Sequence, residues 1–429
     1  MNLFRRKIPR GVIYHSVLQS FRYLLRALRR PLDDGDKVRE FESAFARYCE
    51  RKHGVAFPFA RTAIYFVLKS LNLPKGSEVI LPPITIKGIV DVVVDLGLVP
   101  RYVDLDPDTI CFRIVDLREK IGPATKAVIV TPLFGLVPDM HAMMRLFQER
   151  GIYVIEDFSQ CLNGHFDGKR IGTFGDVGIY SASSIKTLDT LGGGLVVTDD
   201  DRLHDLLCSA KVDLQLPSRN FLVKKAWLNL VRNFATSQPW FSMFTFLLLQ
   251  FIRKRNPEQA LKQTGHRDKS RLVELPKIWF SRYTSVQAEI GLAHLRTVQA
   301  NDTARIENAK FVKLYAGANR FPATTAHSSN VYWQLIIISQ NAIVAQSFFA
   351  YHGVDVATSS LELVCALEDY PNREVLPEAE RIYYNGIFIP CFPSLSRSEI
   401  ERIALLVREF FSNHNGDKLI LGSSPVTKL

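Results

Sequence analysis

The chain has 429 residues, with 54 Lys and Arg against 43 Asp and Glu, so its formal net charge is +11. Its 47% hydrophobic and 23% charged residues exclude disorder for most of the chain, and the length suits one large α/β domain with a smaller one. Six scattered cysteines, without a C-x-x-C or a Cys/His cluster, argue against a metal site and a disulfide framework. They favour a reducing compartment, so we expect a cytoplasmic protein.

The positive charge is concentrated in two segments. Residues 1–30 hold eight basic residues and no acid, and residues 216–275 hold eleven basic and three acidic residues. The rest of the chain is mildly acidic. Nucleic acid is a poor explanation for these segments, because their cations alternate with large apolar side chains. The first residues also lack the apolar core and small-residue cleavage site of a secretory signal.

From about residue 37 the chain alternates between helical and strand patterns. Apolar residues recur at helical spacing at Val38, Phe41, Phe45 and Tyr48, and similar helices are expected at 61–72, 87–97 and 139–151. Short apolar strands are expected at 54–59, 78–83, 101–106, 127–133, 153–158, 178–183 and 193–199. Strands of this kind between helices predict an α/β fold with a mostly parallel sheet covered by helices on both sides.

The sequence character changes after residue 211, which suggests the domain plan. We expect a basic amphipathic segment at 1–36, a large domain at 37–300 that includes a basic and apolar insertion at 216–275, a smaller C-terminal α+β domain at 301–415, and a tail at 416–429.

Three features of the large domain can serve one chemistry. Asp157 ends an apolar strand, Lys186 follows a strand through a Ser-rich turn, and Arg61 and Thr62 open a helix. Ligands of open α/β sheets bind beyond the carboxyl ends of the strands, where a helix N-terminus can bind phosphate. Pyridoxal phosphate requires a lysine, a buried acid and a phosphate cradle. Taken singly, a solvated lysine and a turn-forming aspartate explain the same residues.

The run from residue 154 to 200, VIEDFSQCLNGHFDGKRIGTFGDVGIYSASSIKTLDTLGGGLVVTDD, resembles the DegT/StrS family of sugar aminotransferases, which are fold-type-I pyridoxal-phosphate enzymes. Asp157 precedes Lys186 by the family's spacing, and Gly172 and Gly175 fall where the family has its own glycines. The resemblance extends over 37–211 and 281–412. It implies a transaminase that moves an amino group from an amino acid, with glutamate the usual donor, to a keto sugar.

The resemblance also implies the roles of single residues. Lys186 would form the Schiff base and shuttle the proton, and Asp157 would pair with the pyridinium nitrogen. Further cofactor contacts are implied for Gln160 beside the ring and for Ser181, Thr62 and Arg61 around the phosphate.

Four positions depart from the family pattern. Arg61 stands in a turn that is usually Ser-Gly-Thr, where it either adds a charge to the phosphate site or is an exposed charge at a helix start. Ile86 replaces the aromatic residue that stacks on the cofactor ring, and Leu162 replaces a common His. Phe280 stands where the family has an Asn that reaches the phosphate of the neighbouring subunit.

The two basic segments suggest a membrane surface. In residues 17–28 Leu and Phe side chains share one helical face while arginines occupy the others, and residues 233–252 are uncharged between basic flanks. Polar residues within 233–252 argue against a full span, so we expect peripheral contact through 1–30 and 216–275 at the inner face of the membrane. A helix packed on the body, a lid or an enlarged dimer interface are the alternatives.

The resemblance therefore predicts a homodimeric pyridoxal-phosphate aminotransferase for a nucleotide-linked keto sugar in surface polysaccharide or glycan biosynthesis. Two alternatives stay open: the same chemistry on a lipid-linked or membrane-bound acceptor, and a catalytically idle family member that acts as a scaffold or regulator.

Overall fold

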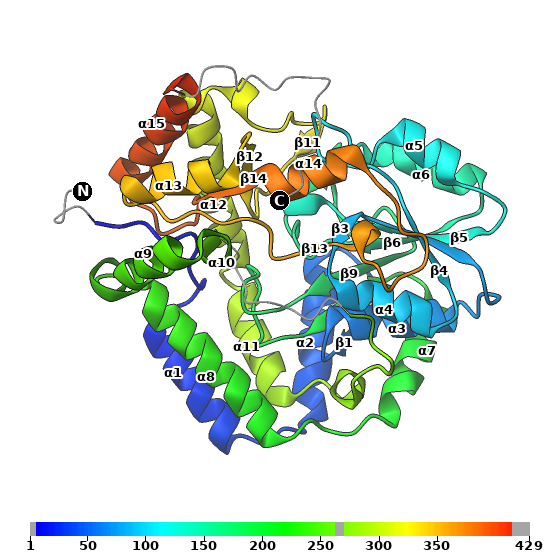
Figure 1. Cartoon of the computed structure of the whole chain (residues 1–429). Helices are drawn as coiled ribbons and strands as arrows, with labels where there is room; N and C mark the ends of the chain where they lie inside the picture. Colours follow the sequence, from blue (N-terminus) through cyan, green and yellow to red (C-terminus); the bar gives the residue numbers. More distant parts are fainter. Residues whose placement is uncertain (1–5, 262–269, 414–429) are drawn as a thin grey trace.

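A seven-stranded sheet forms the centre of the protein in the computed structural model, which describes residues 6–261 and 270–413 (Figure 1). Its strands, in spatial order, are β1 (His53–Phe57), β10 (Gly194–Thr198), β9 (Val177–Ser181), β6 (Tyr153–Asp157), β5 (Thr125–Val130), β2 (Glu78–Leu81) and β4 (Val99–Tyr102). The run from β9 to β4 is parallel, whereas β10 and β1 are antiparallel to their neighbours. The predicted mostly parallel sheet is confirmed.

Helices surround this sheet because its strands are apolar on both faces. Val79, Ile80 and Leu81 of β2 are completely buried, as expected for a strand covered from two sides. The surrounding helices are α2 (Gly35–Tyr48), α3 (Ala60–Ser70), α4 (Lys87–Asp95), α5 (Ile114–Lys120), α6 (Met140–Glu149), α7 (Asp201–Val212) and α11 (Ser285–Leu295). The six cysteines, all within the described residues, are free thiols.

The C-terminal part is built on a two-stranded antiparallel sheet of β12 (Leu335–Ile338) and β14 (Gly386–Ile389). Its helices are α12 (Val298–Ala316), α13 (Ala342–Tyr351), α14 (Pro377–Asn385) and α15 (Arg397–Asn413). The boundary expected at residue 300 falls in the first turn of α12, and the division into domains stays a prediction. The tail expected at 416–429 lies outside the described residues.

Short strands complete the fold. β3 (Ile84–Thr85) pairs with β13 (Glu362–Leu363), and β7 (His165–Phe166) pairs with β8 (Lys169–Arg170) and β11 (Ser328–Ser329).

Two helices, one from each basic segment, lie side by side at one edge of the molecule (Figure 1). Helix α1 (Val17–Arg29) packs antiparallel to α8 (Arg219–Thr236), whose Arg219 guanidinium donates to the carbonyls of Ala27 and Arg30. The chain then continues through a π-helical turn (Phe241–Thr245) into α9 (Phe246–Arg255) and α10 (Pro257–Leu261). The uncharged stretch 233–252 is thus split between two helices, and none of the helices in the described ranges is long and apolar enough to cross a bilayer.

Helix α1 turns a mixed face toward the body. Ser20, Tyr23, Leu24 and Ala27 are the buried residues of α1. Leu18, Phe21 and Leu28, which belong to the apolar face expected to contact a membrane, are about half exposed. The buried face is partly polar because α8 offers it hydrogen-bonding groups: Asn233 Nδ2 donates to His15 O and Ser20 Oγ, and such groups are buried at low cost when they are hydrogen-bonded.

A buried histidine pair ties this helix pair to the body. The rings of His15 and His294 stack with centroids 5.0 Å apart, and His294 Nδ1 lies 2.6 Å from the Asp189 carbonyl oxygen, to which it donates. Burial lowers the pKa of His15 to about 3 and that of His294 to about 4. Both rings therefore stay neutral in the folded protein at pH values where unfolded histidine is protonated.

We expect the contact between α1 and the body to weaken as the pH falls below 6.5. The lowered pKa values mean that unfolding takes up protons between pH 6.5 and about 4, so stability is present above this window and is lost on acidification. Asp189, whose pKa burial raises to about 6, offsets only one of the two histidines. Hydrogen exchange of α1 amides, corrected for intrinsic rates, should speed up by about tenfold from pH 6 to pH 5.

His15→Gln should flatten this dependence, because the remaining histidine is balanced by Asp189. Helix α15, which contains no histidine, serves as the internal reference. Equal acceleration in α1 and α15 would contradict the role of the histidine pair.

Candidate active site

Asp157 and Lys186 meet at the carboxyl ends of the two central strands β6 and β9. Asp157 is the last residue of β6, and its register partner in β9 is Ile179. Lys186 follows in the turn after β9, where its amide donates to the carbonyl of Ser183 at 2.9 Å. Each side chain is only 7% exposed. An amine and a carboxylate that were 29 residues apart in sequence thus share one buried site.

The residue before Asp157 explains the two glycines of the motif. Because successive side chains of a strand alternate between faces, Glu156 points away from Asp157. Its carboxylate is completely buried and accepts from the amides of Gly172 (2.8 Å) and Gly175 (2.6 Å). Gly172 has a φ of +93°, and a Cβ on Gly175 would lie 2.8 Å from the Val154 carbonyl oxygen. The glycine turn is therefore a structural support for the strand that carries Asp157.

Lys186 has the environment of a neutral amine. Its Nζ lies 3.5 Å from the centroid of the Trp333 ring. The pKa of Lys186 is lowered to about 7, mainly by burial. The charge of Asp157 opposes this shift, and the charge of Arg305 adds to it. Burial raises the pKa of Asp157, against the hydrogen bond from the Ser159 amide (3.1 Å) and the charge of Lys186. An amine that loses its proton near neutrality can act as a nucleophile or a general base.

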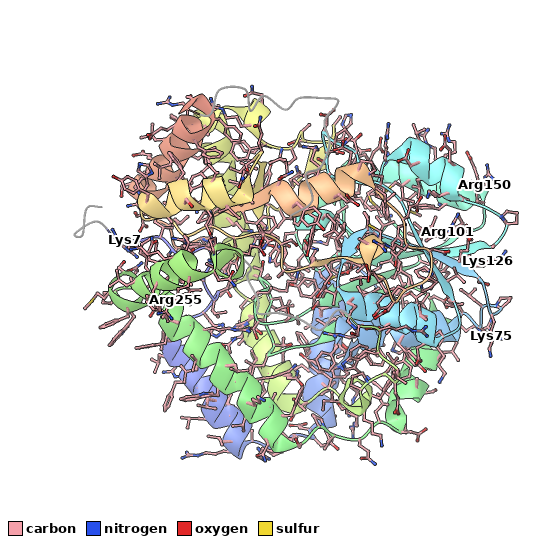
Figure 2. All side chains as sticks on the ribbon, in the orientation of Figure 1. Lys7, Lys75, Arg101, Lys126, Arg150 and Arg255 are labelled. Atoms are coloured by element: carbon pink, nitrogen blue, oxygen red, sulfur yellow. The ribbon has the colours of Figure 1, made fainter. Side chains whose placement is uncertain are left out.

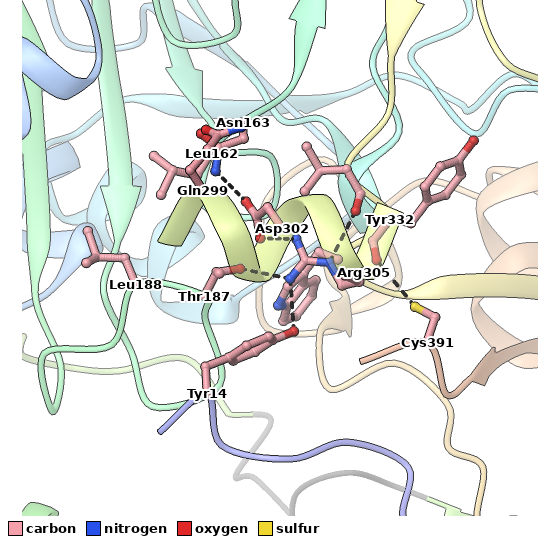
Figure 3. Close-up of polar contacts among 12 residues, drawn as sticks. Tyr14, Leu162, Asn163, Thr187, Leu188, Gln299, Asp302, Arg305, Tyr332 and Cys391 are labelled. Carbon is pink, nitrogen blue, oxygen red and sulfur yellow. Dashed lines mark hydrogen bonds and ion pairs between the residues drawn. The ribbon is translucent and has the colours of Figure 1, made fainter. Parts of the chain in front are cut away.

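Hydrogen bonds on both sides of Lys186 fix the loop that carries it. Trp333 Nε1 donates to the carbonyl of Ile185 at 3.1 Å. On the other side, Arg305 Nη1 donates to Thr187 Oγ1 at 2.8 Å, as Figure 3 shows. Beyond them, the Leu188 amide donates to the hydroxyl of Tyr180 at 3.1 Å. Because these hydrogen bonds hold the loop on both sides of Lys186, its amine is already positioned before a ligand binds, and little conformational entropy is lost on binding.

Arg305 gathers distant segments around this loop (Figure 3). Its guanidinium pairs with Asp302 at 2.6 Å and donates to the Tyr14 hydroxyl at 2.9 Å and to the Val331 carbonyl at 3.2 Å. The other carboxylate oxygen of Asp302 accepts from Asn163 Nδ2 at 2.8 Å. Sequence reasoning missed Arg305 and Trp333, since an i,i+3 ion pair on a helix and a tryptophan in an apolar strand usually indicate nothing beyond packing.

The remaining ring and phosphate candidates surround the same strand ends. Gln160 is buried, and its Oε1 accepts from the amide of Phe134 at 2.7 Å. Ser181 ends β9, where its amide donates to Ser159 Oγ at 2.8 Å. Ile86 is half-buried at the N-cap position of α4. All three positions stay predictions for cofactor contact.

The turn at the start of α3 is held from the side by Trp279. Thr62 is completely buried, and its hydroxyl donates to the Trp279 carbonyl at 2.7 Å, so its proton is committed there. The Arg61 guanidinium stacks over Trp279 at 4.6 Å and over Phe59 at 5.3 Å. Arg61 is thus packed on two aromatic rings, and is not a solvated charge at a helix start. Phe280 lies in an aromatic cluster with Tyr65, 4.9 Å between centroids.

These residues suit pyridoxal phosphate. A buried amine with a lowered pKa can condense with its aldehyde, a buried carboxylate can hold its pyridine nitrogen protonated, and α3 begins without an acidic residue in its first turn. A lysine and an aspartate so placed at the strand ends of this sheet make it a candidate site for a pyridoxal-phosphate enzyme.

The family model described as "DegT/DnrJ/EryC1/StrS aminotransferase family" matches residues 19–213 and 259–408. The chain therefore belongs to this family. Residues 214–258, which include α8 and α9, lie outside the match.

Individual relatives agree with this assignment. The chain is 25% identical to a GDP-perosamine synthase of Escherichia coli O157:H7, over 88% of this chain and 91% of that protein. It is 34% identical to a UDP-N-acetyl-3-dehydro-alpha-D-glucosamine 3-aminotransferase of Acidithiobacillus ferrooxidans, over 42% of this chain and 51% of that one. The fold matches a solved aminotransferase from Psychrobacter cryohalolentis (TM-score 0.70, 21% identity, 92% of this chain and 98% of that one). It also matches an E. coli GDP-4-keto-6-deoxy-D-mannose-3-dehydratase with bound hydrated PLP (TM-score 0.71, 17% identity, 94% and 100%).

In the cofactor-free protein we expect the amine of Lys186 to titrate near pH 7. Its reaction with an amine-acylating reagent, followed by mass spectrometry of the Lys186 peptide, should have a midpoint far below the ordinary 10.5. Asp157→Asn should shift the midpoint lower, because Asp157 is the negative charge that stabilises the ammonium. A midpoint near 10 in both proteins would show that the amine is solvated.

Proposed function

We propose that this protein transfers an amino group from an amino acid, with glutamate the first candidate, to the keto group of a nucleotide-linked sugar in polysaccharide biosynthesis. The observation that carries the proposal is the buried, low-pKa Lys186 beside Asp157 in a member of this family. The names of the relatives, a GDP-perosamine synthase and a UDP-linked 3-aminotransferase, support the nucleotide sugar as acceptor.

Two residues would carry the chemistry. Pyridoxal phosphate, when bound, supplies the electron sink. Asp157, as the ionised carboxylate, would hold the proton on its ring nitrogen. The neutral Lys186 amine would take the proton from the α-carbon of the donor amino acid and, in the reverse half-reaction, deliver a proton to the aminated carbon of the sugar. The presence of Lys186 favours this over the dehydratase branch, in which the resemblance implies a replaced lysine.

The other predicted contacts would orient the cofactor. Gln160 and Ile86 would border its ring, while Ser181 and the start of α3, with Arg61 and Thr62, would hold its phosphate. The hydrogen bonds that immobilise Ile185 and Thr187 keep the amine in place between the two half-reactions.

Lys186→Ala should abolish covalent attachment of pyridoxal phosphate and lower turnover at least about a thousandfold, because the general base and the attachment point are lost together. Borohydride reduction followed by peptide mass spectrometry detects the attachment, and amino transfer from glutamate to UDP- and GDP-linked keto sugars measures turnover. Lys75→Ala, at an exposed lysine, is the matched control. A purified protein that takes up no pyridoxal phosphate would instead support the idle scaffold.

We also infer that the protein works as a homodimer at the inner face of a membrane. Large apolar side chains, each between 42% and 59% exposed, occur on α1, on α8, on α9 and on the segment that joins α8 to α9; we call this set the apolar arm face. It consists of Leu18, Phe21, Leu28, Trp227, Leu228, Val231, Phe234, Trp240, Met243, Phe244, Leu247, Leu248 and Phe251. Exposed apolar surface of this extent on a monomer marks a contact surface.

The charges around this face favour an anionic bilayer as the partner. No acidic residue occurs in 1–32 or 216–257, whereas Arg22, Arg29, Lys254 and Arg255 are exposed there. Arg255 lies on α9, and Lys75, Arg101, Lys126 and Arg150 lie at the opposite edge of the molecule (Figure 2). Cations beside half-exposed Trp and Leu side chains are the composition of an interfacial helix pair.

The full-length protein should bind vesicles that contain phosphatidylglycerol at low salt and release them as salt rises. Leu248→Glu with Phe251→Glu should weaken binding at least about tenfold, because each glutamate removes buried apolar area and adds like charge to the lipid surface. Leu405→Glu, an equally exposed leucine on α15, should change nothing.

Sedimentation velocity of the same variants separates the bilayer from a subunit interface. If the wild type does not bind vesicles and the double variant sediments as a monomer while the wild type sediments as a dimer, the apolar arm face is the dimer interface and the membrane proposal is wrong.

The same face gives one reason to test a second acceptor. An enzyme held at a bilayer can meet a lipid-linked keto sugar as well as a soluble one. Product analysis with membrane lipid extracts, beside soluble nucleotide sugars, distinguishes the two acceptors.

A further inference from the structure

Lys225 lies on the inner side of α8 and reaches the loop that follows Lys186. Its Nζ is 4.5 Å from the centroid of the Phe59 ring and 4.7 Å from that of Phe221. A Cβ at Gly192 would lie 2.3 Å from this Nζ, and Gly192 also has a φ of +107°. The φ value favours glycine, and the short distance places the ammonium group of Lys225 directly against the glycine run after Lys186.

Arg61 contacts the same Phe59 ring. Its guanidinium is 5.3 Å from the Phe59 centroid and 4.6 Å from that of Trp279. Arg61 belongs to the first turn of α3, a turn with no acidic residue and no side-chain cap. Two cations therefore stand beside a helix N-terminus, whose dipole adds further positive potential.

This cationic pair adjoins the strand end that leads to Lys186. A Cβ at Gly194 would lie 2.2 Å from the Phe59 carbonyl oxygen and 2.4 Å from the Ala60 amide nitrogen. Gly194 is in turn the register partner of Ser181 across β10 and β9. The peptide between Phe59 and Ala60 therefore packs against Gly194, which lies opposite Ser181 in the neighbouring strand. Lys186 follows Ser181 by five residues.

Lys225 and Arg61 lie close enough for their charges to repel each other. Burial, and then the charge of Arg61, lower the pKa of Lys225 to about 8. The charge that opposes this shift is that of Asp189, whose oxygens already accept from the Leu191 amide and from Asn229 Nδ2. A phosphate dianion between the cations would relieve this repulsion and stabilise both charged forms.

We propose that Lys225, supplied by the insertion, acts with Arg61 as the phosphate-binding pair of the cofactor site. Lys225 lies in residues 214–258, which the family model leaves unmatched, so this contact would be one that the present chain adds to the family's site. The ligand group is a phosphate dianion, and the source we assign is the phosphate of pyridoxal phosphate. This inference rests on the proposed function.

Comparison of pyridoxal phosphate with pyridoxal, which lacks the phosphate, tests the assignment. Dissociation constants for both are measured by visible absorbance titration of cofactor-free wild type, Lys225→Met and Lys224→Met. Loss of one charge-assisted phosphate contact should weaken pyridoxal phosphate about 10- to 100-fold in Lys225→Met and leave pyridoxal unchanged. Lys224, the exposed neighbour on the same helix, is the matched control and should have no effect.

Inorganic phosphate gives a second measurement that needs no adduct at Lys186. It should compete with pyridoxal phosphate in the wild type and compete more weakly in Lys225→Met. Circular dichroism spectra and thermal melts establish that the variant is folded, and Lys225→Gln repeats the test if Lys225→Met is not.

The other possible results of these titrations each contradict a specific part of the proposal. Equal weakening of both ligands would make Lys225 a structural residue. An unchanged affinity for pyridoxal phosphate with weakened binding of UDP and GDP would assign the cations to the nucleotide diphosphate of the substrate instead. A wild type that binds both ligands equally would overturn the phosphate pair and leave the aminotransferase standing, whereas a wild type that binds neither would overturn both.

Discussion

The Asp302–Arg305 ion pair connects the parts of the chain on which the active site depends. Both side chains are at most 1% exposed, and the pair sits on the helix that begins the C-terminal part. Through it the N-terminal segment (Tyr14), the lysine loop (Thr187) and the segment before β12 (Val331) share one guanidinium. Breaking a buried pair by removing one partner typically costs about 3–5 kcal/mol, because the other charge is left without compensation.

This ion pair also acts electrostatically on the lysine. Arg305 is one of the charges that lower the pKa of Lys186, while its hydrogen bond to Thr187 fixes the backbone next to the amine. Arg305 thus influences both the position and the protonation state of the Lys186 amine. Asp157 acts in the opposite direction on that pKa, so the amine is poised between an acid at the strand end and a cation from the C-terminal part.

The parts of the site that are contiguous in sequence could be predicted from it. The spacing of Asp157, the two glycines and Lys186 is local, since one strand, one turn and the next strand bring them together. The mostly parallel sheet followed for the same reason from local apolar patterns. Trp333 and Arg305 could not be predicted, because they come to Lys186 from more than a hundred residues away and have no distinctive local pattern.

The helix pair α1–α8 shows a second limit of sequence patterns. Periodicity identified α1 as amphipathic but left open whether its apolar face packs on the protein or faces outward. In the structure Ser20, Tyr23, Leu24 and Ala27 face inward, where α8 buries Asn229 and Asn233, while Leu18 and Leu28 remain exposed. Periodicity reports how many apolar residues share a face, and only the partner decides which face is buried.

Helix α8 has two sides with different tasks. Lys225 points toward Gly192 and the start of α3, while Trp227 and Leu228, two and three residues later, belong to the outer surface. The proposed phosphate contact and the proposed surface contact thus share one helix. Any coupling between them through α8 must be reciprocal, so a surface partner that strengthens cofactor binding would itself be bound more tightly by the cofactor-loaded protein.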